Sequence, residues 1–347
     1  MPTYRTIAIV FAALLPGCVA ALAQQAPLPN GTDDKTIYLN VVVAGKSGPP
    51  VSGLTQQDFT LFDNKAPRPI TSFKAVSADQ EQMETIVLLD AVNARFTTVS
   101  YAQAEVQKFL TANGGKLAQP TALAFLTDKG LEADSSFSTD GNALSASLNN
   151  HTSRLREINR SAGFWGADER LQISLNAIHQ LTSYASSLPG RKLVLWISPG
   201  WPLLSGPGVE MDTAERRKIF GDIVDFSGLL RQANVTLYDI NPIGPGESVL
   251  GADYYQSFLT GIKDPGQTDL GDLGLQVLAV QSGGLVLLGT NDIAEMLQQC
   301  TADARTWYEI GFSEAPTEKP NEYHQIDIKI DKPGLKARTR TGYYAQP

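Results

Sequence analysis

The chain has 347 residues, of which 42% are hydrophobic and 18% are charged, with a formal charge of −8 at pH 7. This composition provides for at least one large hydrophobic core and excludes a chain that is disordered throughout. The acidic balance argues against sequence-independent binding to nucleic acid or to anionic lipid, because both need basic patches.

The first 23 residues have the features of a secretory signal peptide. Arg5 precedes an apolar run over residues 7–15, and Ala21-Leu22-Ala23 forms an A-x-A cleavage site. We therefore expect cleavage after Ala23 and a mature protein that is secreted or periplasmic. A buried N-terminal helix is one alternative. Another is a lipid anchor on Cys18, because Leu15-Pro16-Gly17-Cys18 loosely resembles a bacterial lipobox, although proline before the glycine is atypical.

Cleavage would change both the charge and the cysteine content. Residues 1–23 hold Arg5 and no acid, so the formal charge would move from −8 to −9. Cys300 would remain as the single cysteine, which excludes an internal disulfide. We expect it to be a small buried residue on a helix, with an intermolecular bridge or a reactive thiol as the alternative. No later stretch reaches about 18 uninterrupted apolar residues, so we expect no membrane span.

Short strands dominate the start of the mature chain. Residues 24–35 are polar and carry two prolines, which predicts a flexible lead-in. Apolar residues then alternate over residues 37–43, and strands around residues 59–61 and 70–73 follow turn signals. This pattern predicts a small antiparallel sheet over residues 36–80.

Strands and helices alternate over residues 81–304. Continuous apolar runs are typical of parallel strands buried on both faces, and they occur at 85–90, 122–126, 193–197, 235–238 and 285–288. Helices are predicted between and after them, at 98–111, 140–149, 168–187, 212–232, 270–281 and 291–304. Residues 242–267 are rich in Gly and Pro and form a long loop. The alternation predicts an α/β domain, Rossmann-like, with a mainly parallel sheet and helices on both faces.

The short-strand pattern returns over residues 305–347. Apolar residues alternate over 308–312 and again over 326–330. Neither terminal segment has enough strands to form a stable sheet alone. We therefore expect residues 305–347 to pack with residues 36–80 in one small β sandwich that flanks the α/β domain.

Several short motifs accompany this order of elements. They are Val51-Ser52-Gly53-Leu54-Thr55, Asp58-Phe59, Leu88-Leu89-Asp90-Ala91, Leu188-Pro189-Gly190-Arg191-Lys192 and Thr341-Gly342-Tyr343-Tyr344. In their order and spacing they resemble the von Willebrand factor type A domain, and most closely a bacterial subfamily of exported, type A-related proteins. The resemblance covers about residues 36–344. It implies a Rossmann-like fold and binding to a protein partner.

Type A domains usually hold a divalent cation, using an Asp-x-Ser-x-Ser motif, a middle-loop Thr and a late Asp. Asp90 matches the first ligand, but Val92 and Ala94 stand at the two serine positions. Pro199 replaces the late carboxylate, and the middle loop over 161–168 has no threonine. Because Mg²⁺ needs several oxygen ligands, we predict that no Mg²⁺ or Mn²⁺ binds at Asp90.

Asp90 has a structural interpretation beside the ligand one. A carboxylate at a strand end often accepts backbone N–H bonds from the next loop. A metal site would need other oxygen donors, and Asn93, Asp168 or Asp239 are the candidates.

Aromatic residues near the carboxyl ends of the strands indicate a binding surface, because ligands usually lie at that edge of such sheets. Trp201 follows the fourth strand, Trp165 lies in the middle loop beside Phe164, and Tyr254 precedes Tyr255 in the long loop. Exposed Trp and Tyr are typical interface anchors. The alternative is that they cover the sheet and pack internally. The predicted binding residues are Asp90, Asn93, Trp165, Ser198, Trp201, Asp239 and Tyr254.

The chemical motifs are weak. The order Ser198, Asp239, His324 is that of α/β-hydrolases, but Trp196 stands where a nucleophile elbow needs glycine. His151, His179 and His324 have no metal-ligand spacing, and the Gly-Pro-Gly turns at 206–208 and 244–246 do not open helices. We therefore predict no enzyme activity and no cofactor, with the serine hydrolase as an alternative.

These observations favour an exported protein-binding module without a metal bridge, whose partner the sequence does not identify. A second alternative is a scaffold or assembly subunit of an envelope complex that uses the β sandwich as its contact surface.

Overall fold

A computed structural model describes residues 36–347 except 79, 82, 135, 153–162, 205–210 and 244–253. The predicted signal peptide, the lead-in and both Gly-Pro-Gly turns lie outside the described residues. Residues 36–347 form one unit. Among the helices that the structure describes, none is both long enough and apolar enough to cross a membrane.

The central sheet has the strand order β11-β10-β9-β5-β6-β7, and β8 also pairs with β6. Neighbouring strands from β11 to β6 run parallel, whereas β7 and β8 pair antiparallel with β6. The strands are β5 (Glu84–Asp90), β6 (Lys116–Thr127), β7 (Gly130–Ala133), β8 (Ser138–Asp140), β9 (Lys192–Ile197), β10 (Val235–Ile240) and β11 (Val286–Leu287). Every residue of β5, β9 and β10 is buried, as expected for strands covered on both faces.

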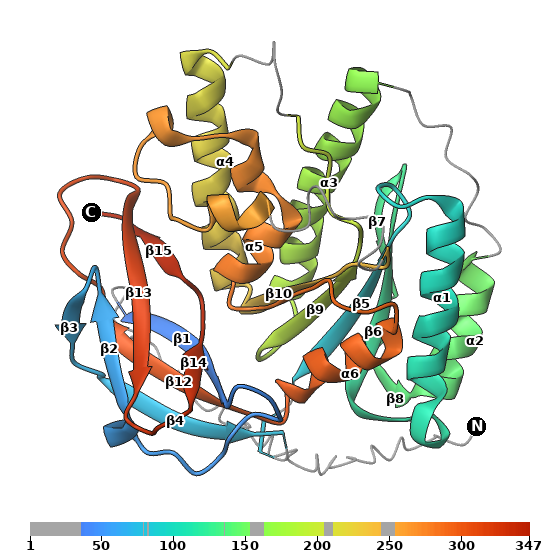
Figure 1. The fold of residues 1–347 in the computed structure, drawn as a ribbon, viewed down its shortest axis with the longest axis horizontal. Coiled ribbons are helices and arrows are strands. Elements are labelled where there is room, and N and C mark those ends of the chain that lie inside the picture. The colour runs from blue at the N-terminus through green and yellow to red at the C-terminus, as the bar shows by residue number, and fades with distance from the viewer. Residues whose placement is uncertain are drawn as a thin grey trace, which may run out of the picture. The chain divides into compact units, whose positions relative to one another are not determined.

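Helices cover both faces of this sheet (Figure 1). Alternate strand residues point to opposite faces, so Leu88 packs with α3, α4 and α5, while Leu89 packs with α1, α2 and α6. The helices are α1 (Phe96–Thr111), α2 (Gly141–Thr152), α3 (Gly163–Ser186), α4 (Thr213–Gln232), α5 (Leu275–Gln281) and α6 (Ile293–Ala302). Short 3₁₀ turns are η1 (Gln56–Asp58), η2 (Ala112–Gly115), η3 (Tyr254–Phe258), η4 (Pro265–Gln267) and η5 (Leu270–Leu273).

Two four-stranded sheets form the β sandwich, with the orders β14-β1-β12-β4 and β15-β13-β2-β3. Each sheet mixes strands from both ends of the chain, and they share a core that includes Leu39, Leu61 and Ile310. The strands are β1 (Thr36–Ala44), β2 (Phe59–Asp63), β3 (Ala66–Arg68), β4 (Ser72–Ser77), β12 (Thr306–Ser313), β13 (Glu322–Ile330), β14 (Lys336–Arg338) and β15 (Gly342–Ala345). The predicted fold class is confirmed, namely an α/β domain flanked by terminal β segments.

Several elements differ from the sequence predictions, and three of the differences have a local reason. Strand β3 contains Pro67 and lies at a sheet edge, where a missing N–H is tolerated. The predicted helix 270–281 is two pieces, because Gly274 is extended between η5 and α5. Helix α3 begins at Gly163 instead of near residue 168, so Phe164 and Trp165 lie in its first turn and not in a loop.

Candidate functional site

The strands β5, β9 and β10 bring three of the predicted residues to one edge of the sheet. Asp90 closes β5, Ser198 follows β9, and Asp239 lies next to the last residue of β10. Strand alternation places Asp90 on the same face as Leu88, and Asp239 on the same face as Leu237. Both leucines pack against α3, α4 and α5, so the two carboxylates share this face.

The Asp90 carboxylate is enclosed by hydrogen-bond donors from the protein. Oδ1 accepts the backbone N–H groups of Val92 (2.9 Å) and Asn93 (2.8 Å). Oδ2 accepts the Asn93 side-chain amide (2.9 Å), the Ser198 hydroxyl (2.9 Å) and the Trp196 indole N–H (3.2 Å). Asp90 is only 2% exposed. Its oxygens therefore accept five hydrogen bonds and hold two strands and the following loop together.

This donor set does not fit a divalent cation. Burial raises the pKa of the Asp90 carboxyl, and hydrogen bonds from Asn93, Ser198 and Trp196 work in the opposite direction. The N–H donors cannot act as metal ligands, and the Asn93 amide also donates to Ser174 Oγ (2.8 Å) on α3. Among the described residues, no group of three or more His, Cys, Asp or Glu is placed to hold a metal ion. A cation at Asp90 would have to displace these hydrogen bonds.

Asp239 has the opposite environment. Its side chain is 0% exposed, and neither carboxylate oxygen has a hydrogen-bond partner among the residues that the structure describes. Burial raises the pKa of Asp239 well above its usual value, and the charge of Asp90 adds to this. The Gln276 amide lies nearby but outside hydrogen-bond geometry, and it lowers the pKa. Asp239 is therefore a buried acid whose neutral form the fold favours.

Gln276 is a site residue that the sequence analysis missed. It lies in the first turn of α5, and its Oε1 accepts the Tyr254 hydroxyl (3.0 Å). Gly200 has a φ of +97°, and a Cβ there would lie 2.4 Å from Gln276 Nε2. The amide thus fills space that only glycine leaves open. No sequence motif marks this contact, because it joins residues 76 positions apart.

The predicted aromatic anchors are not all exposed. Trp201 is 5% exposed and packs edge-to-face on Trp196, with ring centroids 5.4 Å apart, so its prediction as a surface anchor is wrong. It is buried because it closes the core beneath α3 and α4. Tyr254 is partly buried and directs its hydroxyl at Gln276. Trp165 is 78% exposed and stacks edge-to-face on the half-exposed Phe164.

The structure does not assemble Ser198, Asp239 and His324 into a triad. The Ser198 hydroxyl donates to Asp90, and Asp239 has no hydrogen bond within the described part of the chain. His324 lies on β13 in the sandwich, where its Nδ1 is 2.8 Å from Asp63 Oδ1 and its ring stacks on Tyr343. Each residue therefore has a separate environment.

The two remaining histidines pack against aromatic rings, His179 at the surface and His151 partly buried. His179 lies against Phe226, with ring centroids 5.0 Å apart, and His151 stacks on Phe125 at 4.6 Å. Cys300 is a free, fully buried cysteine on α6, as expected.

A groove of about 580 Å³ lies between α3 and α4, and Phe164 is part of its wall. Leu171, Leu175, Leu204, Ile219 and Leu273 give it an apolar lining. Asp168, Glu215 and Asp222 add three acids, and Lys218 forms an ion pair with Asp222 (2.9 Å). The groove is therefore apolar within and acidic in balance.

Comparison with known proteins gives only distant likenesses. No protein-family model matches the sequence, and no curated protein matches it. Among solved structures, human Sec24c is 8% identical with a TM-score of 0.35, over 79% of this chain and 44% of that chain. The manganese-loaded TRAP protein of Plasmodium vivax is 10% identical with a TM-score of 0.35, over 79% of this chain and 98% of that one. The minor pilin PilB of Streptococcus sanguinis is 12% identical with a TM-score of 0.33, over 64% and 63%.

Likenesses at this level carry no argument about function. The architecture itself, a mostly parallel sheet covered by helices with antiparallel sheets from the termini, is consistent with a type A-like fold. The functional conclusion therefore depends on the residues of this chain.

Proposed function

We propose that this chain is an exported, non-enzymatic module that binds a protein partner without a bridging metal. The absence of a bridging metal is supported by the Asp90 carboxylate, because its oxygens already accept five hydrogen bonds from the protein itself. Because the Asp90 carboxylate is occupied by these bonds, the partner must be recognised by direct contact with exposed side chains.

The observation that carries the proposal is the exposed pair of Phe164 and Trp165. Trp165 is 78% exposed and contacts the half-exposed Phe164, and tryptophan is enriched among the residues that dominate interface energies. Phe164 also lines the groove between α3 and α4, so the exposed ring of Trp165 and the apolar lining of the groove form one continuous surface. Together they form a surface suited to an inserted apolar side chain.

The charges of the groove define the chemistry of the partner. Asp168, Glu215 and Asp222 outnumber the single cation Lys218, which is already paired with Asp222. An apolar segment flanked by lysine or arginine would complement both the lining and the rim. We therefore propose a partner that inserts apolar side chains between α3 and α4 and places basic residues beside them.

A capture experiment with matched variants tests this proposal. The exported fraction is passed over the wild-type protein, Trp165→Ala and Phe96→Ala, each in Mg²⁺ and in chelator. Phe96 is a comparable exposed aromatic at the start of α1, away from the groove. We expect capture by wild type and Phe96→Ala, loss with Trp165→Ala, and no effect of chelator. A photo-crosslinker at position 165 should label the same partner at a basic segment.

Other outcomes would contradict the proposal. Capture that disappears in chelator would restore a metal bridge, and equal capture by Trp165→Ala would move the contact elsewhere. Labelling of Ser198 by a fluorophosphonate probe would revive the hydrolase alternative.

Export has its own test. N-terminal sequencing of the mature protein from the extracellular or periplasmic fraction should begin at Gln24. A mass that includes a lipid on Cys18 would overturn cleavage after Ala23, and a protein found only in the cytoplasm would overturn export.

A further inference from the structure

A second pocket lies away from the proposed partner surface, where α4 ends beside the β sandwich. It has a volume of about 280 Å³ and is lined by Tyr38 and Asn40 of β1, Arg231 of α4, Asn234 and Arg340. Tyr38 and Asn40 face it because the alternate residues Leu39 and Val41 point into the sandwich core. Arg340 lies between β14 and β15. We call this the arginine pocket.

Arg340 is buried without a partner. Its side chain is 8% exposed, yet in the described part of the chain it forms no ion pair and donates no hydrogen bond. The buried Arg191 and the partly buried Arg338 differ from it. Arg191 donates to Thr236 and to the Asp303 carbonyl, and Arg338 pairs with the Asp303 carboxylate. A buried guanidinium normally has such partners, so the isolation of Arg340 is exceptional.

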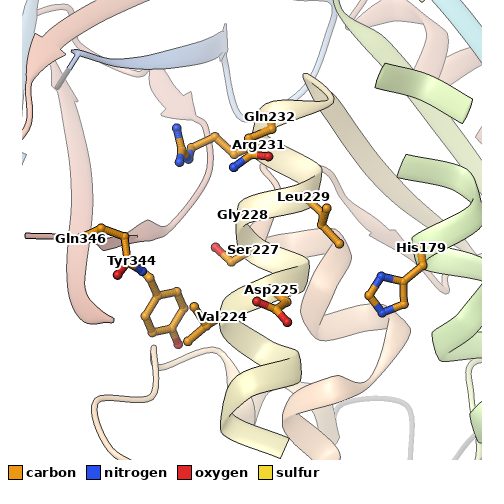
Figure 2. A pocket seen from close by; sticks show the side chains of 10 residues that line it. All are labelled: His179, Val224, Asp225, Ser227, Gly228, Leu229, Arg231, Gln232, Tyr344 and Gln346. Atoms are coloured by element: carbon orange, nitrogen blue, oxygen red, sulfur yellow. The ribbon is translucent and has the colours of Figure 1, made fainter. Parts of the chain in front are cut away.

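Arg231 brings a second cation to the same pocket. Its side chain also has no hydrogen bond or ion pair within the residues described. Figure 2 shows a neighbouring pocket, in which Arg231 projects from α4 on the side where Tyr344 and Gln346 lie, with His179 on the opposite side. The guanidinium of Arg231 therefore extends toward the sandwich, the part of the chain that supplies Arg340.

Without an anion in the pocket, burial and mutual repulsion both disfavour the charged forms of these two arginines. Burial lowers the pKa of Arg340 to about 9, and the positive charge of Arg231 adds to this effect. Glu309 is the acid among the lining residues, but it forms no ion pair with either arginine. Burial also raises the pKa of Glu309, and Lys74 is a cation that lowers it. An anion from outside would relieve the repulsion.

We propose that the arginine pocket binds a phosphate-class oxyanion, either inorganic phosphate or a phosphomonoester. Two guanidinium groups balance a dianion, and the planar fork of each matches two oxygens of a tetrahedral group. Asn40 donates to Asn234 Oδ1 (2.6 Å), which leaves the Asn234 amide N–H groups free for an acceptor. Tyr38 is half exposed at the pocket and offers a ring face beside the anion, which suits an organic phosphate.

Thermal unfolding and calorimetric titration test the site, with phosphate, phenyl phosphate, sulfate and acetate at constant ionic strength. The variants are Arg340→Met, Arg231→Gln and the control Arg217→Gln, which removes an exposed arginine from the same helix. We expect phosphate or phenyl phosphate to raise the Tm of wild type and of Arg217→Gln. Arg231→Gln should weaken binding by about tenfold or more, and Arg340→Met should abolish it.

The same series separates loss of binding from loss of folding. Arg340→Met removes a buried charge without a partner, so in phosphate-free buffer its Tm should equal or exceed that of wild type. A Tm rise that persists in both arginine variants, acetate binding as tight as phosphate binding, or no response to phosphate would overturn the proposal. Partner capture through Trp165 is measured in a separate experiment. A negative result for phosphate binding therefore does not bear on the partner surface, and a negative result for partner capture does not bear on the arginine pocket.

Discussion

Replacing Asp90 with alanine should strongly destabilise the protein, because the carboxylate accepts five buried hydrogen bonds. The Ser198 hydroxyl can rotate, and the Asn93 amide keeps its bond to Ser174. The two backbone N–H groups and the Trp196 indole N–H cannot turn to new acceptors. Each buried donor left unpaired costs about 1–3 kcal/mol. Since such losses are not additive, we expect a total of about 4 kcal/mol.

Asp90→Asn provides the matched control. Its amide oxygen can still accept both backbone N–H groups, whereas its amide nitrogen would face the Trp196 and Asn93 donors. We expect a loss of about 2 kcal/mol, between wild type and the alanine variant. Urea unfolding with both the midpoint and the slope measured gives the free energies of unfolding. A total of about 5–15 kcal/mol for a domain leaves both variants measurable.

Two results would refute this reasoning. A loss below about 1 kcal/mol for Asp90→Ala would show that the donors find other acceptors or water. A rise in Tm with Mg²⁺ or Mn²⁺ that is present in wild type and absent in Asp90→Ala would show that the carboxylate binds metal. We expect no such rise.

Other changes test the remaining parts of the structure. Because the pKa of Asp239 is raised in the folded protein, its contribution to stability is complete below about pH 4 and is lost as the pH rises. At neutral pH, Asp239→Asn should therefore unfold at a higher urea concentration than wild type. The difference between the two proteins should shrink toward about pH 4. Burial also raises the pKa of Asp272, to about 6. Asp272 is present in both wild type and Asp239→Asn, so the difference in stability between these two proteins reports on Asp239 alone. The buried Trp201 should lower the free energy of unfolding by about 3–5 kcal/mol when replaced by alanine, and this variant should lose partner capture only as far as it unfolds. The exposed Trp165 should change the free energy of unfolding by about 0.5 kcal/mol or less when replaced by alanine, in the same urea assay. Deleting residues 306–347 removes β12 from β1 and β13 from β2, so hydrogen exchange should show β1 and β2 unprotected, and protected strands would contradict the shared sandwich.

Local sequence patterns were sufficient for much of this fold. The run at 85–90 predicts β5 because a strand buried on both faces must be apolar throughout, and all seven of its residues are buried. The stripe of apolar residues on α3 predicts a helix for the same kind of reason. The pattern predicts the start of α3 too late, because Phe164 and Trp165 are exposed in its first turn and interrupt the apolar period. Periodicity detects buried faces, and it fails where an element is exposed.

The candidate site was less predictable, because its chemistry depends on contacts across the sheet. Asp90 at a strand end is compatible with both a metal ligand and a structural acceptor, and the choice depends on Trp196 of β9 and on Ser198, which follows it. The place of Trp201 after β9 allows either a surface anchor or internal packing, and its contact with Trp196 shows the second. Arg340 gave no signal at all, since nothing in the sequence around it shows that its side chain is enclosed.

Three buried ionisable groups in this molecule lead to opposite expectations for similar substitutions. Asp90 has five donors, whereas Asp239 and Arg340 have no hydrogen-bond or ion-pair partner among the described residues. Burial costs each of them solvation, but only Asp90 recovers it from the protein. Neutralising Asp90 should therefore destabilise the fold, while neutralising Asp239 at neutral pH, or Arg340 without phosphate, should stabilise it. If all three substitutions destabilised the protein alike, the partners that distinguish these charges would not govern their energetics, and the assignment of Arg340 to an anion would lose its physical basis.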